Sequence, residues 1–224
     1  MIVIQTVYTK RIYATALKLL VLIRKEYTLY DLDDAEYVAH SPETIQFFMK
    51  YCSACSVGSR ELLKYAKMFN PRSFLLTSPV TSHNKRKCKV NSIYTIGWIG
   101  CFWGAHKNSL YQLFFPAIQN ITSPLKVVIL GAKCNDLKNE LIDFFSHNKN
   151  IELDIPMDIN WFDESAIYER VKDFDLGVSP LLDTEINRAK SAYKLKQYFS
   201  CGVPALCSCI GENAFFLEDG VNGY

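Results

Sequence analysis

The chain has 224 residues, of which 49% are hydrophobic, and a formal net charge of +2. This length and composition suit one large or two small globular domains and exclude a disordered chain. The balanced charge gives no argument for nucleic-acid binding. No signal peptide and no bilayer-spanning apolar run is visible, and most of the eight cysteines lie in apolar runs, as reduced thiols do. We therefore expect a cytoplasmic protein.

The first third of the chain alternates short apolar strands with helices. We expect strands at 2–5, 28–32, 54–57 and 74–77, and helices at 11–26, 42–51 and 60–69. Ser41 and Ser59 are expected to cap the second and third helices. The first helix should be a core helix, with one apolar face formed by Ala16, Leu19, Leu20 and Ile23. This alternation predicts a parallel, doubly wound sheet.

Two groups of possible metal ligands occur in this part of the chain. Three carboxylates lie in the run Asp31–Asp34, but no glycine or distal glutamate follows at the spacing of a calcium loop. Cys52 and Cys55 have a C-x2-C spacing, but their partner for zinc would be the C-x-C run Cys207–Cys209. We expect no bound metal at either place.

A polar, basic and aperiodic stretch separates this region from a second α/β region. It covers residues 81–92, and its cluster Lys85–Lys87 would attract anionic lipid only weakly, so a solvated linker is preferred. Further strands are expected at 94–99, 125–130, 151–155, 175–179 and 204–207, with helices at 107–121, 136–146, 164–174 and 187–201. We therefore expect domains at 1–80 and 93–224, joined by the linker 81–92.

The helix expected at 187–201, with Asn187 as its N-cap, has an unusual polar face. Lys190, Lys194 and Gln197 fall at i, i+4 and i+7 and would point together. Two lysines one turn apart repel each other, and a shared anion would remove that cost. The pattern suggests a phosphate or diphosphate site near a helix N-terminus. An ordinary solvated helix face is the alternative.

The order of residues in this stretch resembles a known family. AKSAYKLKQYFSCGVPALCSCIGEN, followed by LEDGVNGY, is similar to the donor-binding region of GT-B glycosyltransferases of the large group 1 (GT4-like) family. The matching positions are Lys190, Lys194, Tyr198, Gly202, Pro204, Ser208, Gly211, Asn213, Asp219, Gly220, Asn222 and Gly223. TIGWIGCFWG, DFDLGVSPLLD and DLDDA also resemble segments of that family. Its members have a longer N-terminal domain and closing helices, so the chain is expected to be a fragment or a truncated product.

The resemblance implies an α/β fold with two Rossmann-like, doubly wound parallel-sheet domains (GT-B), the N-terminal one incomplete and on the acceptor side. It implies a hexosyltransferase of polysaccharide biosynthesis that moves a sugar from a nucleotide-diphosphate sugar to a glycan or lipid-linked acceptor. The transfer would be retaining and metal-independent, with no cofactor. The chain would act in the cytoplasm or peripherally at the inner face of the membrane, with no nucleic-acid partner.

The resemblance also implies a set of donor-binding residues, while no catalytic residue can be assigned. The set is Gly100, Lys107, Lys190, Lys194, Gln197, Gly211, Glu212 and Asn213. The lysines of the helix would neutralise the departing diphosphate. Gln197 would bind a ribose hydroxyl as a neutral replacement for a glutamate. Lys107 and its neighbour His106 would approach a phosphate or lie on the surface. Glu212 and Asn213 would contact the diphosphate or sugar, or only cap a helix.

Two other functions remain open at this point. The chain could be a catalytically inactive module that binds a nucleotide sugar or a partner protein, which the short N-terminal region favours. It could also be another doubly wound enzyme, such as a sugar-nucleotide epimerase. The KLKQYFSCGVP and DGVNG segments argue against the epimerase.

Overall fold

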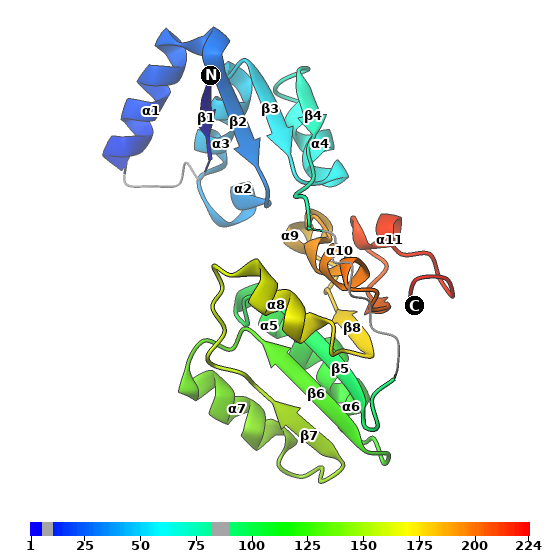
Figure 1. The fold of residues 1–224 in the computed structure, drawn as a ribbon. Helices are drawn as coiled ribbons and strands as arrows, with labels where there is room; N and C mark the ends of the chain where they lie inside the picture. Colours follow the sequence, from blue (N-terminus) through cyan, green and yellow to red (C-terminus); the bar gives the residue numbers. More distant parts are fainter. Residues whose placement is uncertain (6–10, 82–89) are drawn as a thin grey trace. The chain divides into compact units, whose positions relative to one another are not determined.

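The computed structural model describes residues 1–5, 11–81 and 90–224. They form an α/β fold with two parallel sheets, which confirms the predicted fold class (Figure 1). The chain divides into two compact units. Unit 1 comprises 1–79, 183–191 and 210–212, and unit 2 comprises 80–182, 192–209 and 213–224. Residues 82–89, most of the expected linker with its basic cluster, lie outside the described residues.

Unit 1 contains a four-stranded parallel sheet in the order β1-β2-β3-β4. The strands are β1 (Ile2–Ile4), β2 (Thr28–Leu32), β3 (Ala54–Val57) and β4 (Ser73–Leu75). The helices are α1 (Arg11–Ile23), α2 (Glu36–Ala39), α3 (Pro42–Tyr51), α4 (Arg60–Lys67) and α9 (Glu185–Arg188), with a 3-10 turn, η1, at Lys25–Tyr27. Both predicted serine caps are confirmed, because Ser41 accepts the N–H of Thr44 and Ser59 accepts the N–H of Leu62.

Helix α1 does not bury the face predicted from the sequence. Leu19 is 56% exposed and Ile23 is 77% exposed, whereas Val21 is fully buried. The ammonium of Lys18 faces α3, with its Nζ 3.4 Å from the hydroxyl of Thr44. The prediction was wrong because this helix is apolar nearly all round, so its pattern does not single out one face.

Unit 2 contains a five-stranded parallel sheet in the order β7-β6-β5-β8-β9. The strands are β5 (Tyr94–Ile99), β6 (Leu125–Leu130), β7 (Ile151–Asp154), β8 (Leu176–Ser179) and β9 (Ala205–Cys207). The chain winds outward from β5 to β7 and then returns to β8 on the other side of β5. The strand order therefore reverses between β5 and β8, at the kind of position where doubly wound folds bind ligands.

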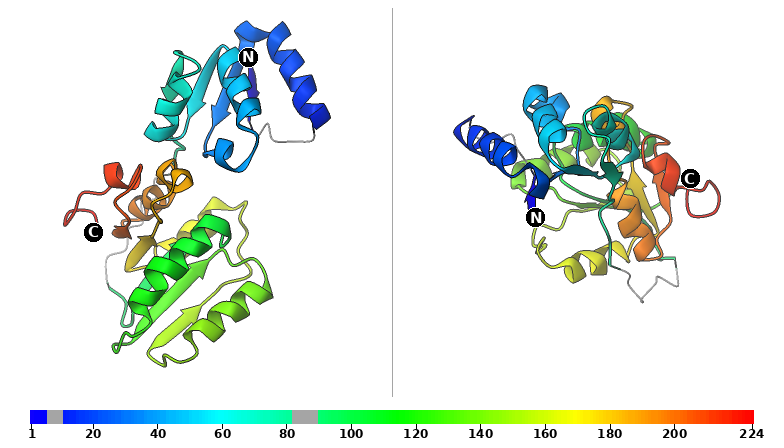
Figure 2. Two further views of the ribbon diagram at one scale, coloured as in Figure 1. Left: turned by 180° about the vertical axis from the view of Figure 1, so that it is seen from behind. Right: turned by 90° about the horizontal axis from the view of Figure 1, so that it is seen from above.

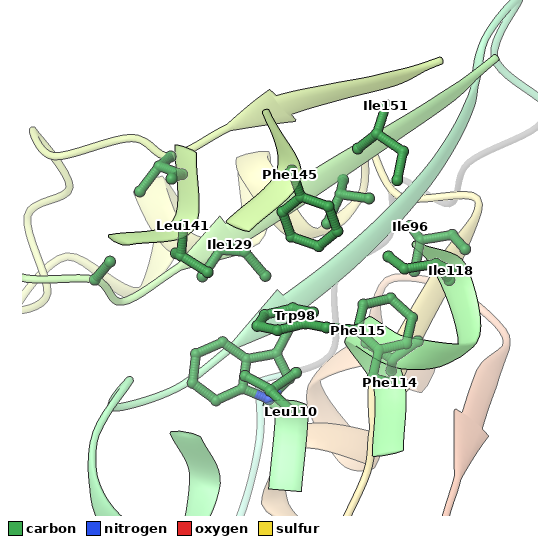
Figure 3. Close-up of a cluster of buried hydrophobic side chains, with 14 of the residues drawn as sticks. Ile96, Trp98, Leu110, Phe114, Phe115, Ile118, Ile129, Leu141, Phe145 and Ile151 are labelled. Carbon is green, nitrogen blue, oxygen red and sulfur yellow. The ribbon is translucent and has the colours of Figure 1, made fainter. Parts of the chain in front are cut away.

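The helices of unit 2 lie on both faces of its sheet, as comparison of Figures 1 and 2 shows. One face carries α5 (Gly104–Ser109), η2 (Leu110–Phe114), α6 (Phe115–Ile118) and α7 (Asn135–Phe145). Side chains of η2, α6 and α7 form a buried cluster with Trp98 and Ile129 of the sheet (Figure 3). The other face carries α8 (Glu164–Val171) and α10 (Tyr193–Ser200), and the short α11 (Asn213–Phe216) follows β9.

The helix after β5 begins and ends earlier than predicted. It runs from Gly104 to Ile118 instead of 107–121, and its central segment η2 has π-helical hydrogen bonding. Pro116 lies two residues after the end of this segment. A proline has no N–H and crowds the carbonyl four residues before it, and a wider turn accommodates both effects.

Candidate functional site

Two glycine loops meet at the carboxyl ends of β5 and β6. The N–H of Gly100 donates to the carbonyl of Leu130 at 2.9 Å, and the N–H of Phe102 donates to the carbonyl of Gly131 at 3.3 Å. Gly100 and Gly131 have φ angles of 152° and 132°, which favour glycine. A Cβ on Gly131 would lie 1.6 Å from the carbonyl oxygen of Gly100. Both loops therefore need glycine in order to pack so closely at this edge of the sheet.

Lys194 of α10 extends over the first of these loops. A Cβ on Gly100 would lie 2.9 Å from Cε of Lys194, so the glycine leaves room for the lysine side chain. The Nζ of Lys194 is 5.7 Å from the ring centroid of Trp98 in β5 and 3.4 Å from Nε2 of His106 in α5. Of the predicted donor-binding residues, the structure thus brings Gly100 and Lys194 together. The contact between Lys194 and the ring of Trp98 was not predicted, because a tryptophan in an apolar strand is usually an ordinary core residue.

The single helix predicted at 187–201 is wrong. The structure has α9 (Glu185–Arg188) and α10 (Tyr193–Ser200), separated at Ala192, whose φ of 53° is left-handed. Asn187 lies inside α9, and the actual N-cap is Thr184, which accepts the N–H of Asn187 at 3.3 Å. Ala189 is buried in the core of unit 1, whereas Leu195 is buried in that of unit 2. The break places each segment in its own core, at a cost of about 1–2 kcal/mol for a left-handed alanine.

The break also separates the two lysines that were expected to share a face. Lys190 belongs to unit 1, where its Nζ lies 2.8 Å from the carboxylate of Asp34. Lys194 belongs to unit 2, so the predicted common helix face is wrong for Lys190. Gln197 lies one turn after Lys194 in α10 and is buried, with 7% of its surface exposed.

Glu212 and Gly211 are placed in unit 1, beside the N-terminus of α4. The Glu212 carboxylate is 2% exposed, accepts the N–H of Arg60 at 2.7 Å and forms an ion pair with the Arg60 guanidinium. An anion at a helix N-terminus is favourable, so Glu212 stabilises the start of α4. Gly211 has a φ of 54°, and a Cβ there would lie 2.4 Å from the carbonyl oxygen of Arg188. The segment 210–212 is therefore fitted tightly between α4 and α9.

Lys107 and Asn213 lie elsewhere in unit 2. The Nζ of Lys107 is 2.6 Å from the carboxylate of Glu140 in α7, and this hydrogen bond lowers the pKa of Glu140. Asn213 is buried at the start of α11, and its side-chain amide donates to the carbonyl of Ser179 at 3.4 Å. These contacts fasten α5 to α7 and α11 to the end of β8.

The carboxylates of Asp31–Asp34 have separate neighbours. Asp31 accepts hydrogen bonds from Ser56 at 2.5 Å and from Gln5, while Asp34 binds Lys190. Within residues 1–5, 11–81 and 90–224, no three histidine, cysteine or acidic side chains are gathered closely enough to hold a metal ion. Cys55 is buried, and burial raises the pKa of its thiol to about 12.

Unit 1 also has a cavity that sequence analysis did not find. Its volume is about 350 Å³, and it lies beside α4, α9 and segment 210–212. Its lining residues are Arg60, Glu61, Lys64, Asp183, Arg188, Ile210, Gly211 and Glu212. The guanidinium of Arg188 donates to both carboxylate oxygens of Asp183, so the positive charge here is largely balanced. The cavity is assembled from three distant segments, which leaves no local signal in the sequence.

Several solved structures that resemble this chain were determined in complex with UDP or a UDP-sugar. HepE of Anabaena in complex with UDP-glucose matches with a TM-score of 0.68 and 12% identity, over 99% of this chain and 64% of that one. TarM of S. aureus in complex with UDP matches with a TM-score of 0.61 and 12% identity, over 88% of this chain and 40% of that one. The pneumococcal O-GlcNAc transferase GtfA with UDP and GlcNAc matches with a TM-score of 0.52 and 15% identity, over 95% of this chain and 47% of that one.

At these identities the likeness establishes the fold alone, which is an α/β fold of the GT-B type with two Rossmann-like parallel sheets. The chain spans less than two thirds of the length of each of these structures. No protein-family model matches the chain, and no curated protein matches it. None of the helices in the described parts of the chain has the length and apolar character needed to cross a membrane.

Proposed function

We propose that this chain binds a nucleotide-diphosphate sugar at the carboxyl edge of the unit 2 sheet and acts as a glycosyltransferase of the GT4-like type. The sugar is transferred with retention and without a metal to a glycan or lipid-linked acceptor, in the cytoplasm or at the inner face of the membrane. The observation that carries this proposal is the position of Lys194 over Gly100. The UDP complexes of the similar structures support UDP as the first nucleotide to test.

The chemistry of such a transfer requires positive charge beside the leaving group. When the bond from the sugar to the diphosphate breaks, negative charge develops on the terminal phosphate. Lys194 holds an ammonium at the end of β5, partly shielded from solvent by Trp98 and His106. Gln197, one turn further along α10, is the proposed ribose contact. Lys190 is not assigned to this role, because its ammonium is bound to Asp34 in unit 1.

The experiment that tests this proposal is a thermal-shift assay of the whole chain with UDP, GDP, ADP and their sugars. A nucleotide at 100 times its dissociation constant stabilises the folded state by about 2.7 kcal/mol, which is measurable as a rise in melting temperature. We expect a rise with UDP that is lost in Lys194→Ala.

The matched control is Lys196→Ala in the same helix. The Nζ of Lys196 lies 5.1 Å from the ring of Phe216, on a different side of α10 from Lys194. We expect this variant to keep the UDP shift. Equal shifts in wild type and Lys194→Ala, or no shift with any nucleotide, would reject the donor site.

A second candidate function is a catalytically inactive module that binds the nucleotide sugar. It is favoured by the ion pair that engages Lys190, which was expected to neutralise a diphosphate, and by the one that engages Lys107, which was expected to approach a phosphate or lie on the surface. Release of UDP from UDP-sugars distinguishes the two functions. A chain that binds UDP but releases none from a panel of UDP-sugars with acceptors is a binding module.

A further inference from the structure

His106 stands directly beside the ammonium assigned to the donor. The Nζ of Lys194 is 3.4 Å from Nε2 of His106. The imidazole also meets the edge of Trp98, with ring centroids 6.2 Å apart and an interplanar angle of 65°. Its other nitrogen, Nδ1, is buried from solvent. The ring is therefore held between β5 and α10, with one nitrogen facing the lysine.

This geometry restricts the protonation state of the ring. An ammonium group has only donors, so Nε2 must accept from Lys194 and cannot carry a proton itself. The ring is then neutral, with its proton on Nδ1. Protonation of Nε2 would place two positive charges 3.4 Å apart, which repel each other in the absence of an anion.

A diphosphate at Lys194 would reverse this preference. A nucleoside diphosphate carries two to three negative charges, and an opposite charge nearby favours the charged form of an imidazole. Lys194 on α10 faces the ring, β5 contributes the uncharged Trp98, and Lys107, which is next to His106 in α5, is paired with Glu140 of α7.

We propose that His106 is a proton-linked positioning residue: neutral, it holds the ammonium of Lys194 over Gly100, and it takes up a proton from solvent when the diphosphate of the nucleotide binds. The proton goes to Nε2, which then donates toward the phosphate side of the site instead of accepting from Lys194. The site thereby gains a second positive charge when the ligand arrives. This inference rests on the proposed donor site.

The coupling also bears on the reaction. The free nucleoside diphosphate carries about one more negative charge than the intact nucleotide sugar. A second positive charge therefore favours the departing diphosphate over the bound substrate, and differential stabilisation of this kind is what lowers a barrier. The same charge slows release of the product nucleotide at lower pH.

The experiment is isothermal titration calorimetry of the whole chain with UDP in two buffers of different ionisation enthalpy, such as HEPES and Tris. The dependence of the observed enthalpy on the buffer gives the number of protons taken up on binding. A single imidazole can take up at most one proton, so we expect an uptake between zero and one proton at about pH 7.5. His106→Gln keeps a side chain that can accept from Lys194 but cannot titrate.

We expect UDP to bind both wild type and His106→Gln, with the proton uptake lost in the variant. His147→Gln is the matched control, because His147 is exposed at the end of α7 and should leave the uptake unchanged. Equal proton uptake in wild type and His106→Gln overturns the inference while the donor site stands. Absence of UDP binding by wild type rejects the donor site and this inference with it.

A second measurement needs no nucleotide. Nitrogen-15 NMR of the histidine rings reports which nitrogen carries the proton. We expect His106 in the unliganded chain at about pH 7.5 to be neutral with the proton on Nδ1. A proton on Nε2, or a doubly protonated ring, would contradict the proposed hydrogen bond.

Discussion

Replacing Tyr198 with phenylalanine should destabilise unit 2 without changing the volume of its core. Tyr198 is fully buried in α10, and its hydroxyl donates to the carbonyl of Val178 at 3.0 Å and accepts the N–H of Ile99 at 3.3 Å. The β5–β8 ladder pairs Ile96 with Leu176 and Gly97 with Gly177. The hydroxyl therefore connects β5 and β8 just beyond the last residues that pair in this ladder.

The variant leaves the N–H of Ile99 and the carbonyl of Val178 without the hydroxyl group that binds both of them. Each net hydrogen bond contributes about 1 kcal/mol, and an unsatisfied buried group costs about 1–3 kcal/mol. We expect the free energy of unfolding of unit 2 to fall by about 2 kcal/mol. With a urea m-value of about 2 kcal/mol/M, the midpoint falls by about 1 M.

Urea unfolding followed by circular dichroism measures this change. Tyr13→Phe is the control, because Tyr13 is 60% exposed on α1 and its variant should stay within about 0.5 kcal/mol of wild type. If Tyr198→Phe also stays within about 0.5 kcal/mol, the bridging role of the hydroxyl is wrong. Weaker UDP binding by Tyr198→Phe is expected as well, since the same helix carries Lys194.

Three other predictions concern unit 1. Arg60→Ala removes the guanidinium that pairs with Glu212, whose side chain is only 2% exposed, so we expect the free energy of unfolding in urea to fall by about 1–3 kcal/mol. The control Lys64→Ala, at an exposed ion pair, should cause no measurable loss. Val21→Ala removes fully buried methyl groups and should cost about 2 kcal/mol, whereas Ile23→Ala at a 77% exposed position should cost less than about 0.5 kcal/mol; equal losses would contradict the orientation of α1. Burial raises the pKa of Cys55 from 9.0 to about 12, so its contribution to stability is complete below pH 9 and is lost as pH rises toward 12; a Cys55→Ala variant should show a shallower fall over this range, and an unchanged fall would refute the assignment.

Much of the fold could be predicted because its signals are local. The bounds of β3 and β5 were predicted to the residue, since short apolar runs ending in turn residues mark buried parallel strands. The caps Ser41 and Ser59 were equally visible, because a capping serine and the N–H that it binds lie three residues apart. The structure brings Gly100 close to Lys194, and the donor-binding role that the family resemblance gives these residues stays a prediction.

The remaining features depend on partners that are distant in the sequence. Lys190 meets Asp34 across 156 residues, and Glu212 meets Arg60 across 152, so no local pattern reveals either pair. The left-handed Ala192 arises because the segments before and after it are buried in different cores. The sequence by itself therefore determined the order of strands and helices and the chemical character of the proposed donor-binding segment, because local backbone preferences and hydrophobic periodicity control them. Only the tertiary structure decided which face of α1 is buried, where the expected helix breaks and which lysine extends over Gly100, because packing against residues far along the chain controls those choices.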